Sequence, residues 1–496
     1  MNTTTLTSSP AATELRAPPG WRTWCTAWRG AWQADWRERR RDWRVWLVIA
    51  AGLMMAICAA LQSSLELNAT LAARAEARQS EQQRWSHQGK KYPHAAAHYG
   101  VYVFKPLSAL AALDPGIERY VGSSVWLEAH KQNEPIYRQA DDEPGAYRQM
   151  RLTPAFVLQV IAPMAMIFLG FGMFAGERER GTLGSLRINA APMGAIALAR
   201  CAVLLCLAAA LALPACIAVC ALEWSPEAQA PFGDGAVRAA VFAGGYLMYL
   251  CTWAALIAAA SAWAPSLRAS LAMLIGLWAA TALVLPRAAL EMAQEAAPLP
   301  SLQQFRAGLD AALGEPDDPQ LAERDRQQLL RQYGVTDVKD LPVNWAGISL
   351  RRGERHGDRI FDEHYGRLFD AMRRQGDAAA LAGWLSPTVA LAGLSSASAG
   401  SDMDHHIQFV NGAERQRRTI QEVMNAAITA NPERNGIRYD GDQALWNQVP
   451  PFRFTFAPLD PAALALRHGL PLAALFLGSL LLCRAGLRQL RRGNLR

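Results

Sequence analysis

Cysteine is absent from two long polar stretches of this 496-residue chain, residues 67–150 and 291–460. The eight cysteines all lie elsewhere: Cys25, Cys58, Cys201, Cys206, Cys216, Cys220, Cys251 and Cys483. Small secreted domains often depend on disulfides, so these stretches must fold by other means if they face an oxidising compartment. The pattern agrees with an outward position without establishing it, because cytosolic domains also lack cysteine.

Signatures of common enzymes are also missing. The chain has no Gly-x-x-x-x-Gly-Lys-Ser/Thr loop to cradle nucleotide phosphates, so any ATP chemistry has to come from another subunit. It has neither the His-Glu-x-x-His pair of metalloproteases nor the Gly-x-Ser-x-Gly turn of serine hydrolases. We therefore expect that the chain is not an enzyme and that it binds no cofactor of its own.

Apolar residues make up 51% of the chain and are gathered into six blocks. A helix needs about 20 apolar residues to cross the hydrocarbon layer, and each block is long enough. The predicted spans are residues 45–67, 154–175, 193–222, 236–262, 269–286 and 461–483. Two insertions remain between spans, residues 68–153 and 287–460, and the second is large enough for its own core.

Few polar side chains lie within these spans. They include Gln62, Glu66, Gln159, Thr252 and Ser261. A transporter driven by protons or ions usually needs ionisable groups at mid-membrane, so their scarcity favours an ATP-driven or purely structural role. Single arginines flank the outer ends of the spans. Each stands apart from other basic residues in the sequence, and its side chain can snorkel to the surface. They are Arg151, Arg238, Arg287 and Arg467.

The formal charge of +7 reflects topology rather than nucleic-acid binding, because the arginines crowd beside the spans and no nucleic-acid-binding motif is evident. Residues 37–44 and the tail at 484–496 are both rich in arginine. By the positive-inside rule both termini are cytoplasmic. We expect a multi-pass protein of the bacterial inner membrane, with the lipid bilayer and no nucleic acid among its partners.

Two different segments precede the first span. Residues 1–20 are rich in Thr, Ser, Ala and Pro, which indicates a disordered cytoplasmic tail. Residues 21–44 carry five tryptophans at steps of three and four, which places the indoles on one helical face. We expect an amphipathic elbow helix at the membrane interface. The alternative is a soluble helix that packs its tryptophans into a protein core.

The insertions are predicted to fold as an outward α+β domain. Residues 68–85 continue the first span as a helical stalk, while residues 99–104 and 121–128 have strand-like composition. Helical patterns occur near residues 302–312, 320–333 and 360–375. The expected fold is a mainly α membrane protein, with six transmembrane helices and an α+β extracytoplasmic domain built from the two insertions.

A charged turn follows the second span. Residues 176–183 read GERERGTL, and four alternating charges cannot remain in lipid. The helix must therefore end, and residues 176–192 run along the cytoplasmic surface before the chain re-enters the membrane. Such a turn can dock a partner, or it can merely stop the helix from sliding.

The residues around this turn resemble a known family. Residues 174–183, reading FAGERERGTL after one apolar helix and before another, are similar to the coupling segment of ABC-2 class transporter permeases. Three further stretches resemble the subgroup with large extracytoplasmic insertions and a poorly defined substrate. They are residues 93–100 running on to 127–130, residues 341–344 running on to 362–364, and residues 385–387 running on to 400–402 and 415.

The resemblance implies a permease subunit of an ATP-driven exporter. A separate ABC ATPase subunit would carry ATP and magnesium, and a second permease copy or a related permease would complete the membrane domain. The residues implied in coupling to the ATPase are Glu177, Arg178, Glu179, Arg180, Gly181 and Thr182. The alternative is a membrane-anchored extracytoplasmic binding or maturation factor that an ATPase drives without moving cargo.

Histidine suggests a second hypothesis. Eight of the nine histidines lie in the insertions: His87, His94, His98, His130, His356, His364, His405 and His406. The pair His405 and His406 adjoins Asp402 and Asp404, and imidazole with carboxylate suits zinc or copper. Polar domains hold most histidines in any case, so these four residues are a candidate metal site and no more. A third hypothesis for the function is a membrane enzyme whose active site lies in the insertions that contain these histidines.

Overall fold

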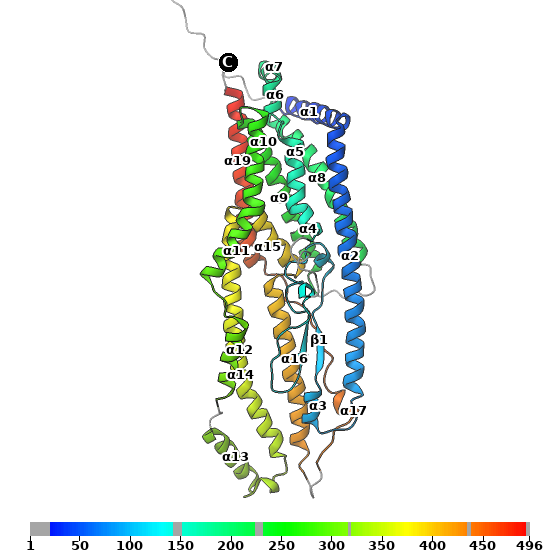
Figure 1. Ribbon diagram of the computed structural model, residues 1–496, viewed down its shortest axis with the longest axis vertical. Coiled ribbons are helices and arrows are strands. Elements are labelled where there is room, and N and C mark those ends of the chain that lie inside the picture. Colours follow the sequence, from blue (N-terminus) through cyan, green and yellow to red (C-terminus); the bar gives the residue numbers. More distant parts are fainter. Residues whose placement is uncertain (1–19, 142–150, 224–231, 316–318, 434–437, 493–496) are drawn as a thin grey trace, which may run out of the picture.

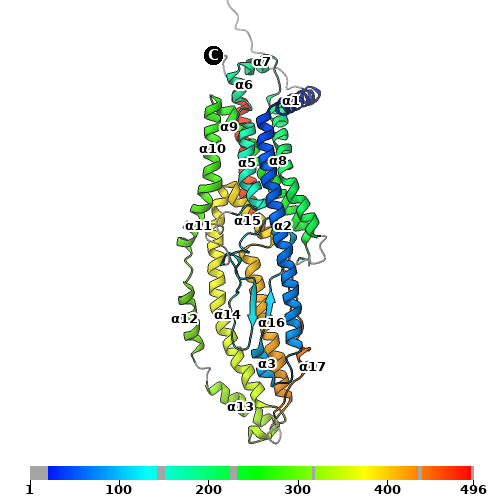
Figure 2. The same cartoon turned by 45° about the vertical axis from the view of Figure 1, so that its right-hand side comes forward.

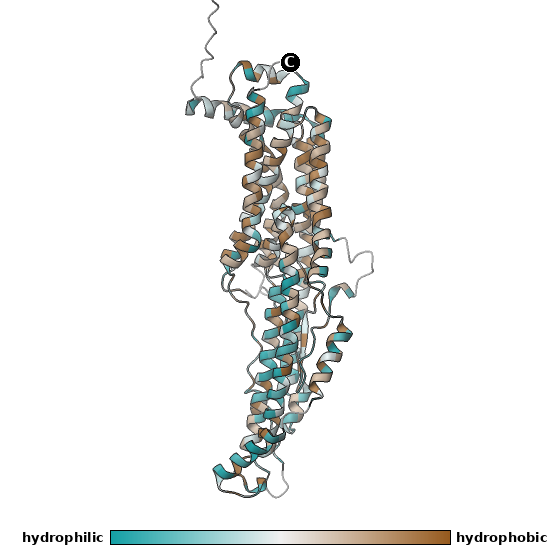
Figure 3. Cartoon of the chain, turned by 90° about the vertical axis from the view of Figure 1, so that its left-hand side faces the viewer, coloured by the Kyte–Doolittle hydropathy of each residue, from teal (hydrophilic) through white to brown (hydrophobic). Residues whose placement is uncertain are grey.

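Apolar and polar sequence separate into two halves of a long molecule. The computed structural model describes residues 20–141, 151–223, 232–315, 319–433 and 438–492. Within these residues, six helices are long and apolar enough to cross a membrane: Trp43–Ser86, Pro154–Glu179, Met193–Leu222, Gly235–Trp263, Leu267–Ala296 and Pro461–Arg491. Hydrophobic residues dominate one half and hydrophilic residues the other (Figure 3). The chain is a multi-pass membrane protein with an extramembrane domain, which we define as the described parts of residues 68–153, 297–386 and 400–460.

The N-terminal helix crosses the end of the bundle. Helix α1 (Trp21–Arg41) stops at Asp42, whose carboxylate accepts from the Arg44 amide (2.9 Å) and caps the next helix. No residue of α1 is buried, so its tryptophans do not pack into a protein core. This exposure fits the interfacial interpretation. The predicted tail at residues 1–19 lies outside the described residues.

Helix α2 (Trp43–Ser86) joins the two halves. It contains 44 residues without a break, so it is about 66 Å long, roughly twice the hydrocarbon thickness. The first span and the predicted stalk are therefore one helix, which runs beside both halves (Figures 1 and 2).

The other spans surround helix α9 (Gly235–Trp263), the most enclosed of them. Tyr249, Trp253 and Ile257 on α9 are fully buried. The remaining membrane helices are α4 (Pro154–Phe156), α5 (Ala162–Gly170), α8 (Met193–Glu223), α10 (Leu267–Ala279), α11 (Leu285–Ala296), α18 (Pro461–Leu464) and α19 (Leu470–Arg492). Two short helices, α6 (Ala175–Glu179) and α7 (Thr182–Ile188), lie at the same end of the molecule as α1 (Figure 1).

Three of the spans contain a wide π-helical turn. These turns are η3 (Val157–Ile161), η4 (Ala280–Val284) and η7 (Ala465–Gly469). Helix α15 (Pro387–Ala399) contacts all three, as well as α9. Its side chains are small, and most of its residues are buried. It is thus a wedge between the membrane bundle and the extramembrane domain, and its position did not follow from the sequence.

Two long helices, α14 (Trp345–Ala380) and α16 (Met403–Ala430), form the frame of the extramembrane domain (Figure 2). They pack with the outer half of α2 around a second core, in which Phe361, Phe409 and Trp446 are almost fully buried. Smaller helices complete the domain: α3 (Pro93–Tyr99), α12 (Leu302–Leu313), α13 (Pro319–Tyr333) and α17 (Gln443–Trp446).

The described residues contain a single two-stranded antiparallel sheet. Strand β1 (Val101–Phe104) pairs with β2 (Ser124–Leu127), and Val101 lies opposite Leu127. Both strands fall where the composition predicted them. The predicted α+β architecture is nevertheless not confirmed, because α14 and α16 supply the largest share of the second core and the sheet is a small addition to it.

Each of the four flanking arginines has a carboxylate partner, and Arg238 is buried among protein groups instead of snorkelling. Arg238 is fully buried, its Nε lies 2.8 Å from Asp234 Oδ1, and it donates to the carbonyls of Ala397 (3.1 Å) and Ala457 (3.0 Å). A buried charge needs such partners. The other pairs are Arg151 with Glu66, Arg287 with Glu291, and Arg467 with Asp377 and Asp404.

A buried ion-pair cluster joins α14 to α16. The guanidinium of Arg417, 2% exposed, lies 2.6 Å from a Glu414 oxygen and 2.5 Å from Asp358 Oδ1. Removing one member of such a cluster leaves its carboxylates buried without a counter-charge.

We predict that Arg417→Ala lowers the free energy of unfolding of the extramembrane domain by about 3–5 kcal/mol. The matched control Arg367→Ala breaks an exposed pair between two residues of α14, Arg367 and Glu363. It should lower the free energy of unfolding by about 1 kcal/mol or less. Urea unfolding of the detergent-solubilised protein, followed by tryptophan fluorescence, measures both. Equal unfolding midpoints for the two variants would contradict the prediction.

Candidate functional site

The second span is broken just before the charged turn. Helix α5 ends at Gly170, and α6 begins at Ala175. Three backbone carbonyls at this break accept hydrogen bonds from side chains of three different helices, α1, α10 and α8. The pairs are Arg39 to Leu169 (2.7 Å), Ser270 to Phe171 (2.7 Å) and Arg200 to Met173. Carbonyls that the helix itself leaves unpaired are thereby satisfied.

The amides on the other side of the break are satisfied by a fourth helix. Ser261 on α9, which is fully buried, accepts from the N–H groups of Phe174 (2.8 Å) and Ala175 (3.0 Å). Irregular backbone at membrane depth is stable only where protein groups replace the lost helical hydrogen bonds. The break is therefore fixed by contacts to α1, α8, α9 and α10.

The first three charges of the turn each contact another helix, Glu177 and Arg178 from half-buried positions and Glu179 from an exposed one. Glu177 Oε1 lies 2.5 Å from Arg200 on α8. Arg178 donates to the carbonyls of Ala262 (2.8 Å) and Ala264, where α9 ends, and Glu179 accepts from the Leu267 amide (2.8 Å), where α10 begins. Arg178 and Glu179 thus each meet a helix end that carries the opposite partial charge. The turn thus contacts three spans besides its own.

The rest of the turn faces outward. Glu179, Arg180, Gly181 and Thr182 are exposed, and Gly181 adopts a positive φ of 76° that redirects the chain into α7. At the end of α7, Ile188 is 72% exposed. We call these five residues the α6–α7 surface. Ile188 was not identified from the sequence, although an isoleucine between Arg187 and Asn189 was a usable signal for a contact residue.

A polar network lies where the bundle meets α15. The amide of Gln159 in η3 donates to the Tyr246 hydroxyl (2.9 Å), which lies 3.1 Å from Ser395 Oγ. The Tyr249 hydroxyl donates to the Gln159 carbonyl and lies 3.1 Å from Thr388 Oγ1. Tyr246 and Tyr249 belong to α9, and Thr388 and Ser395 to α15. We call this set the junction network, since it joins the spans to the wedge helix.

The first insertion holds the other end of α15. Ser108 donates to the Ala399 carbonyl (2.7 Å), and Ser401 donates to the Asp114 carbonyl (2.8 Å). Burial raises the pKa of the Asp114 carboxyl, although hydrogen bonds from Ser395 and Gly116 oppose the shift. Polar contacts therefore hold α15 both to α9, through the junction network, and to the first insertion, through Ser108.

Three of the four candidate metal ligands, Asp402, Asp404 and His405, have polar protein partners. Asp402 caps α16, and its Oδ1 lies 2.5 Å from His405 Nδ1; His405 Nε2 in turn lies 3.1 Å from the Arg238 guanidinium. Asp404 pairs with Arg373 (3.2 Å) and Arg467 (3.1 Å). These contacts account for three of the residues without an ion, and the metal-binding hypothesis for them stays a prediction.

His406 has a different environment. Burial and the nearby Lys105 and Arg138 lower the pKa of His406 to about 3, so its imidazole is neutral. For Asp402, burial alone would raise the carboxyl pKa, but hydrogen bonds and the charge of His405 outweigh it and the pKa lies below its usual value.

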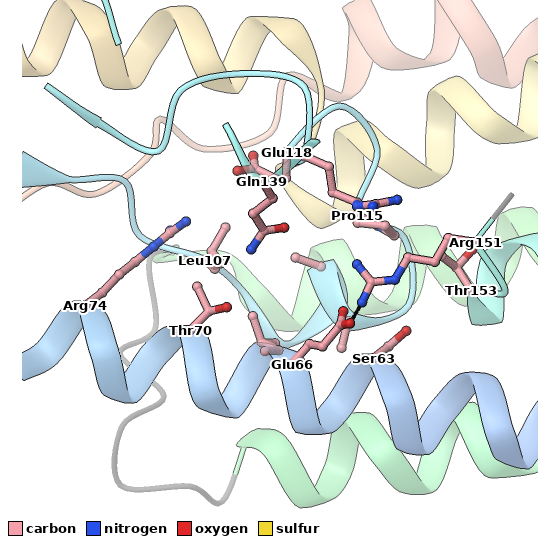
Figure 4. Close-up of a pocket in the computed structure, with 14 residues that line it drawn as sticks. Ser63, Glu66, Thr70, Arg74, Leu107, Pro115, Glu118, Gln139, Arg151 and Thr153 are labelled. Carbon is pink, nitrogen blue, oxygen red and sulfur yellow. Dashed lines mark ion pairs between the residues drawn. The ribbon is translucent and has the colours of Figure 1, made fainter. Parts of the chain in front are cut away.

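Two pockets border helix α2. The first lies where α2 meets the loop of the first insertion, and Figure 4 shows Glu66 paired with Arg151 at one side of it, with Thr70 and Arg74 further along α2. Its volume of about 60 Å³ suits water rather than a ligand. The second, about 390 Å³, lies between α2, β1 and α16 and is lined by Trp85, Trp446 and other residues. Its size falls in the range of small-molecule pockets.

Two family models together match most of the chain. The family model described as ABC-2 family transporter protein matches residues 32–333, and the one described as a domain of unknown function (DUF3526) matches residues 300–455. No curated protein and no solved structure gives a significant match. The first match covers more than half of the chain and five of the six spans described above, and it implies a permease subunit with an ABC ATPase partner. The protein belongs to the ABC-2 family of transporters.

Proposed function

We propose that this protein is the permease subunit of an ATP-driven exporter in the bacterial inner membrane. A separate ABC ATPase, carrying ATP and Mg²⁺, docks on the α6–α7 surface at the cytoplasmic face. Both termini lie on that face, and the extramembrane domain lies outside. The break in the second span carries the proposal, because its contacts connect an exposed surface to four other helices.

The exposed and inward residues of the turn have different tasks in this proposal. The α6–α7 surface offers charge from Glu179 and Arg180 and one apolar side chain, Ile188, to the ATPase. Glu177 and Arg178 transmit its movement, since they bind α8 and the end of α9. Charge-assisted hydrogen bonds suit this role because they are strong and directional.

Helix α9 then carries the movement across the membrane. Its inner end accepts from Arg178 through the Ala262 carbonyl and from the Phe174 amide through the Ser261 hydroxyl, and its middle holds Tyr246 and Tyr249 of the junction network. A helix packed this tightly moves as a rigid body. A shift of α9 therefore reaches α15, and through α15 it reaches the extramembrane domain.

Six spans with one ATPase-binding turn constitute half of a transporter. We propose that a second copy, or a related permease, completes the membrane domain, so that two ATPase subunits bind side by side. Nucleotide binding closes the ATPases and selects one arrangement of the spans, and hydrolysis releases it.

We predict that Ile188→Asp, and separately Arg180→Glu, reduces copurification of the ATPase at least tenfold, because each places an unfavourable charge in the contact. The matched control is Leu302→Asp, which alters an exposed apolar residue of α12 in the other half of the molecule. Affinity purification from native membranes measures the retained ATPase. Full retention by both turn variants would refute docking at this surface.

The double variant Glu177→Gln, Arg178→Gln should separate docking from transmission. It keeps the α6–α7 surface but loses the charged contacts to α8 and α9. We expect the ATPase to copurify normally, while ATP hydrolysis by the complex in proteoliposomes falls to the rate of the free ATPase. Unchanged hydrolysis, with normal membrane insertion, would show that these residues do not transmit movement.

Orientation can be tested by labelling single cysteines in a variant whose native cysteines have been replaced. A cysteine at Thr182 should react with an impermeant maleimide only from the cytoplasmic side, and one at His87 only from outside. Both positions are exposed. Labelling of both from the same side would reject the proposed topology.

A further inference from the structure

Three histidines of the first insertion converge on one point. His94 and His98 are one turn apart on α3, and His130 follows β2. The Nε2 atom of His94 lies 3.2 Å from that of His98 and 3.4 Å from that of His130. Each residue offers a ring nitrogen within 4.8 Å of the others, and no other set of three such ligand residues was found among the described residues. This set differs from the one that the sequence suggested.

The local fold fixes these positions. Ala96 and Ala97 bury the opposite face of α3, which leaves His94 and His98 on the free face at a spacing of four residues. His130 stands at the tip of a tight turn that the Glu128–Lys131 bridge closes, and its φ is +63°. Histidine tolerates this conformation better than most residues do, but it is uncommon outside glycine.

Hydrogen bonding alone does not satisfy the cluster. A neutral imidazole has one accepting nitrogen with a single in-plane lone pair, so His94 Nε2 cannot accept well from His98 and His130 together. The rings are splayed rather than stacked, with interplanar angles of 86°, 45° and 61°. Nitrogens bound at about 2.0–2.1 Å to a tetrahedral ion lie roughly 3.3–3.4 Å apart, which is close to the two measured separations.

A carboxylate lies behind one of the rings. His130 Nδ1 is 3.7 Å from Glu354 Oε1, and Glu354 accepts from the Asn425 amide. Metal-binding histidines commonly direct their second nitrogen at such a carboxylate, which fixes the ring and the tautomer. Glu354 is buried, and it borders a cavity of about 270 Å³ that also contains His130. The second nitrogen of His130 therefore faces a carboxyl group deeper in the domain, at a distance longer than a hydrogen bond.

We propose that His94, His98 and His130 bind one divalent transition-metal ion, of the Zn²⁺ or Cu²⁺ class, through their Nε2 atoms. Imidazole is a preferred ligand for these ions. Because His98 and His130 are exposed, the fourth position stays open to water or to a donor group from outside. Three protein ligands with an open position are typical of sites where the metal meets an external ligand. The proposal does not depend on coupling to an ATPase.

The test is a titration of the purified full-length protein with ZnCl₂, and separately with CuCl₂, against a competing chromophoric chelator. The protein carries a purification tag without histidine. We expect one equivalent to bind, and X-ray absorption of the loaded protein should show about three imidazole nitrogens near 2.0 Å. The double variant His94→Ala, His98→Ala and the single variant His130→Ala should each bind at least about 100-fold more weakly. Glu354→Gln should weaken binding about tenfold, as loss of an outer partner does.

His87→Ala is the matched control, because His87 is an exposed histidine of the same insertion and is not part of the cluster. It should bind the ion as the natural protein does. Thermal unfolding without metal checks that the variants are folded, and added zinc should raise the unfolding temperature of the natural protein but not of the cluster variants. No binding by the folded natural protein, or unchanged binding in a folded cluster variant, would overturn the proposal.

Discussion

A gap in a membrane helix is tolerated only if every exposed backbone group finds a partner, and this requirement organises the membrane half of the protein. Between Gly170 and Ala175 the second span loses several of its own hydrogen bonds, and Arg39, Ser270, Arg200 and Ser261 replace them from four different helices. Lipid cannot supply such partners. None of the four helices can therefore move independently of the break, and the charged turn that follows it inherits the same connections.

The two halves of the molecule have separate cores, and helix α15 lies between them. Membrane helices pack around Tyr249 and Trp253, while the extramembrane core contains Phe361 and Trp446. Helix α15 offers hydroxyl groups to the junction network, and its Leu391 and Leu394 are buried against α9. Because close-packed apolar side chains transmit displacement, these contacts couple α15 to α9.

Sequence reasoning identified what depends on local composition. The six apolar blocks, the charged turn and the strand segments at 101–104 and 124–127 all lie where their residues predicted. Gln159 and Ser261 stood out as rare polar groups in spans, and both now have buried partners.

Features that depend on distant segments were missed. Arg238 finds Asp234 nearby but also His405, 167 positions away. Helix α15 is apolar and short, so nothing local distinguishes a wedge from a core helix. His94, His98 and His130 meet only because the β1–β2 hairpin returns the chain to α3.

The unbroken length of α2 has a mechanical consequence. A rod about 66 Å long that is tilted by 5° at one end moves its other end by about 6 Å. The far end of this rod bears Trp85 and forms one wall of the roomy groove whose opposite wall belongs to α16. A small reorientation of α2 within the bilayer would therefore displace Trp85 and the Trp446 carbonyl bound to it, and so the wall of the outer cavity, without any hinge in the helix itself.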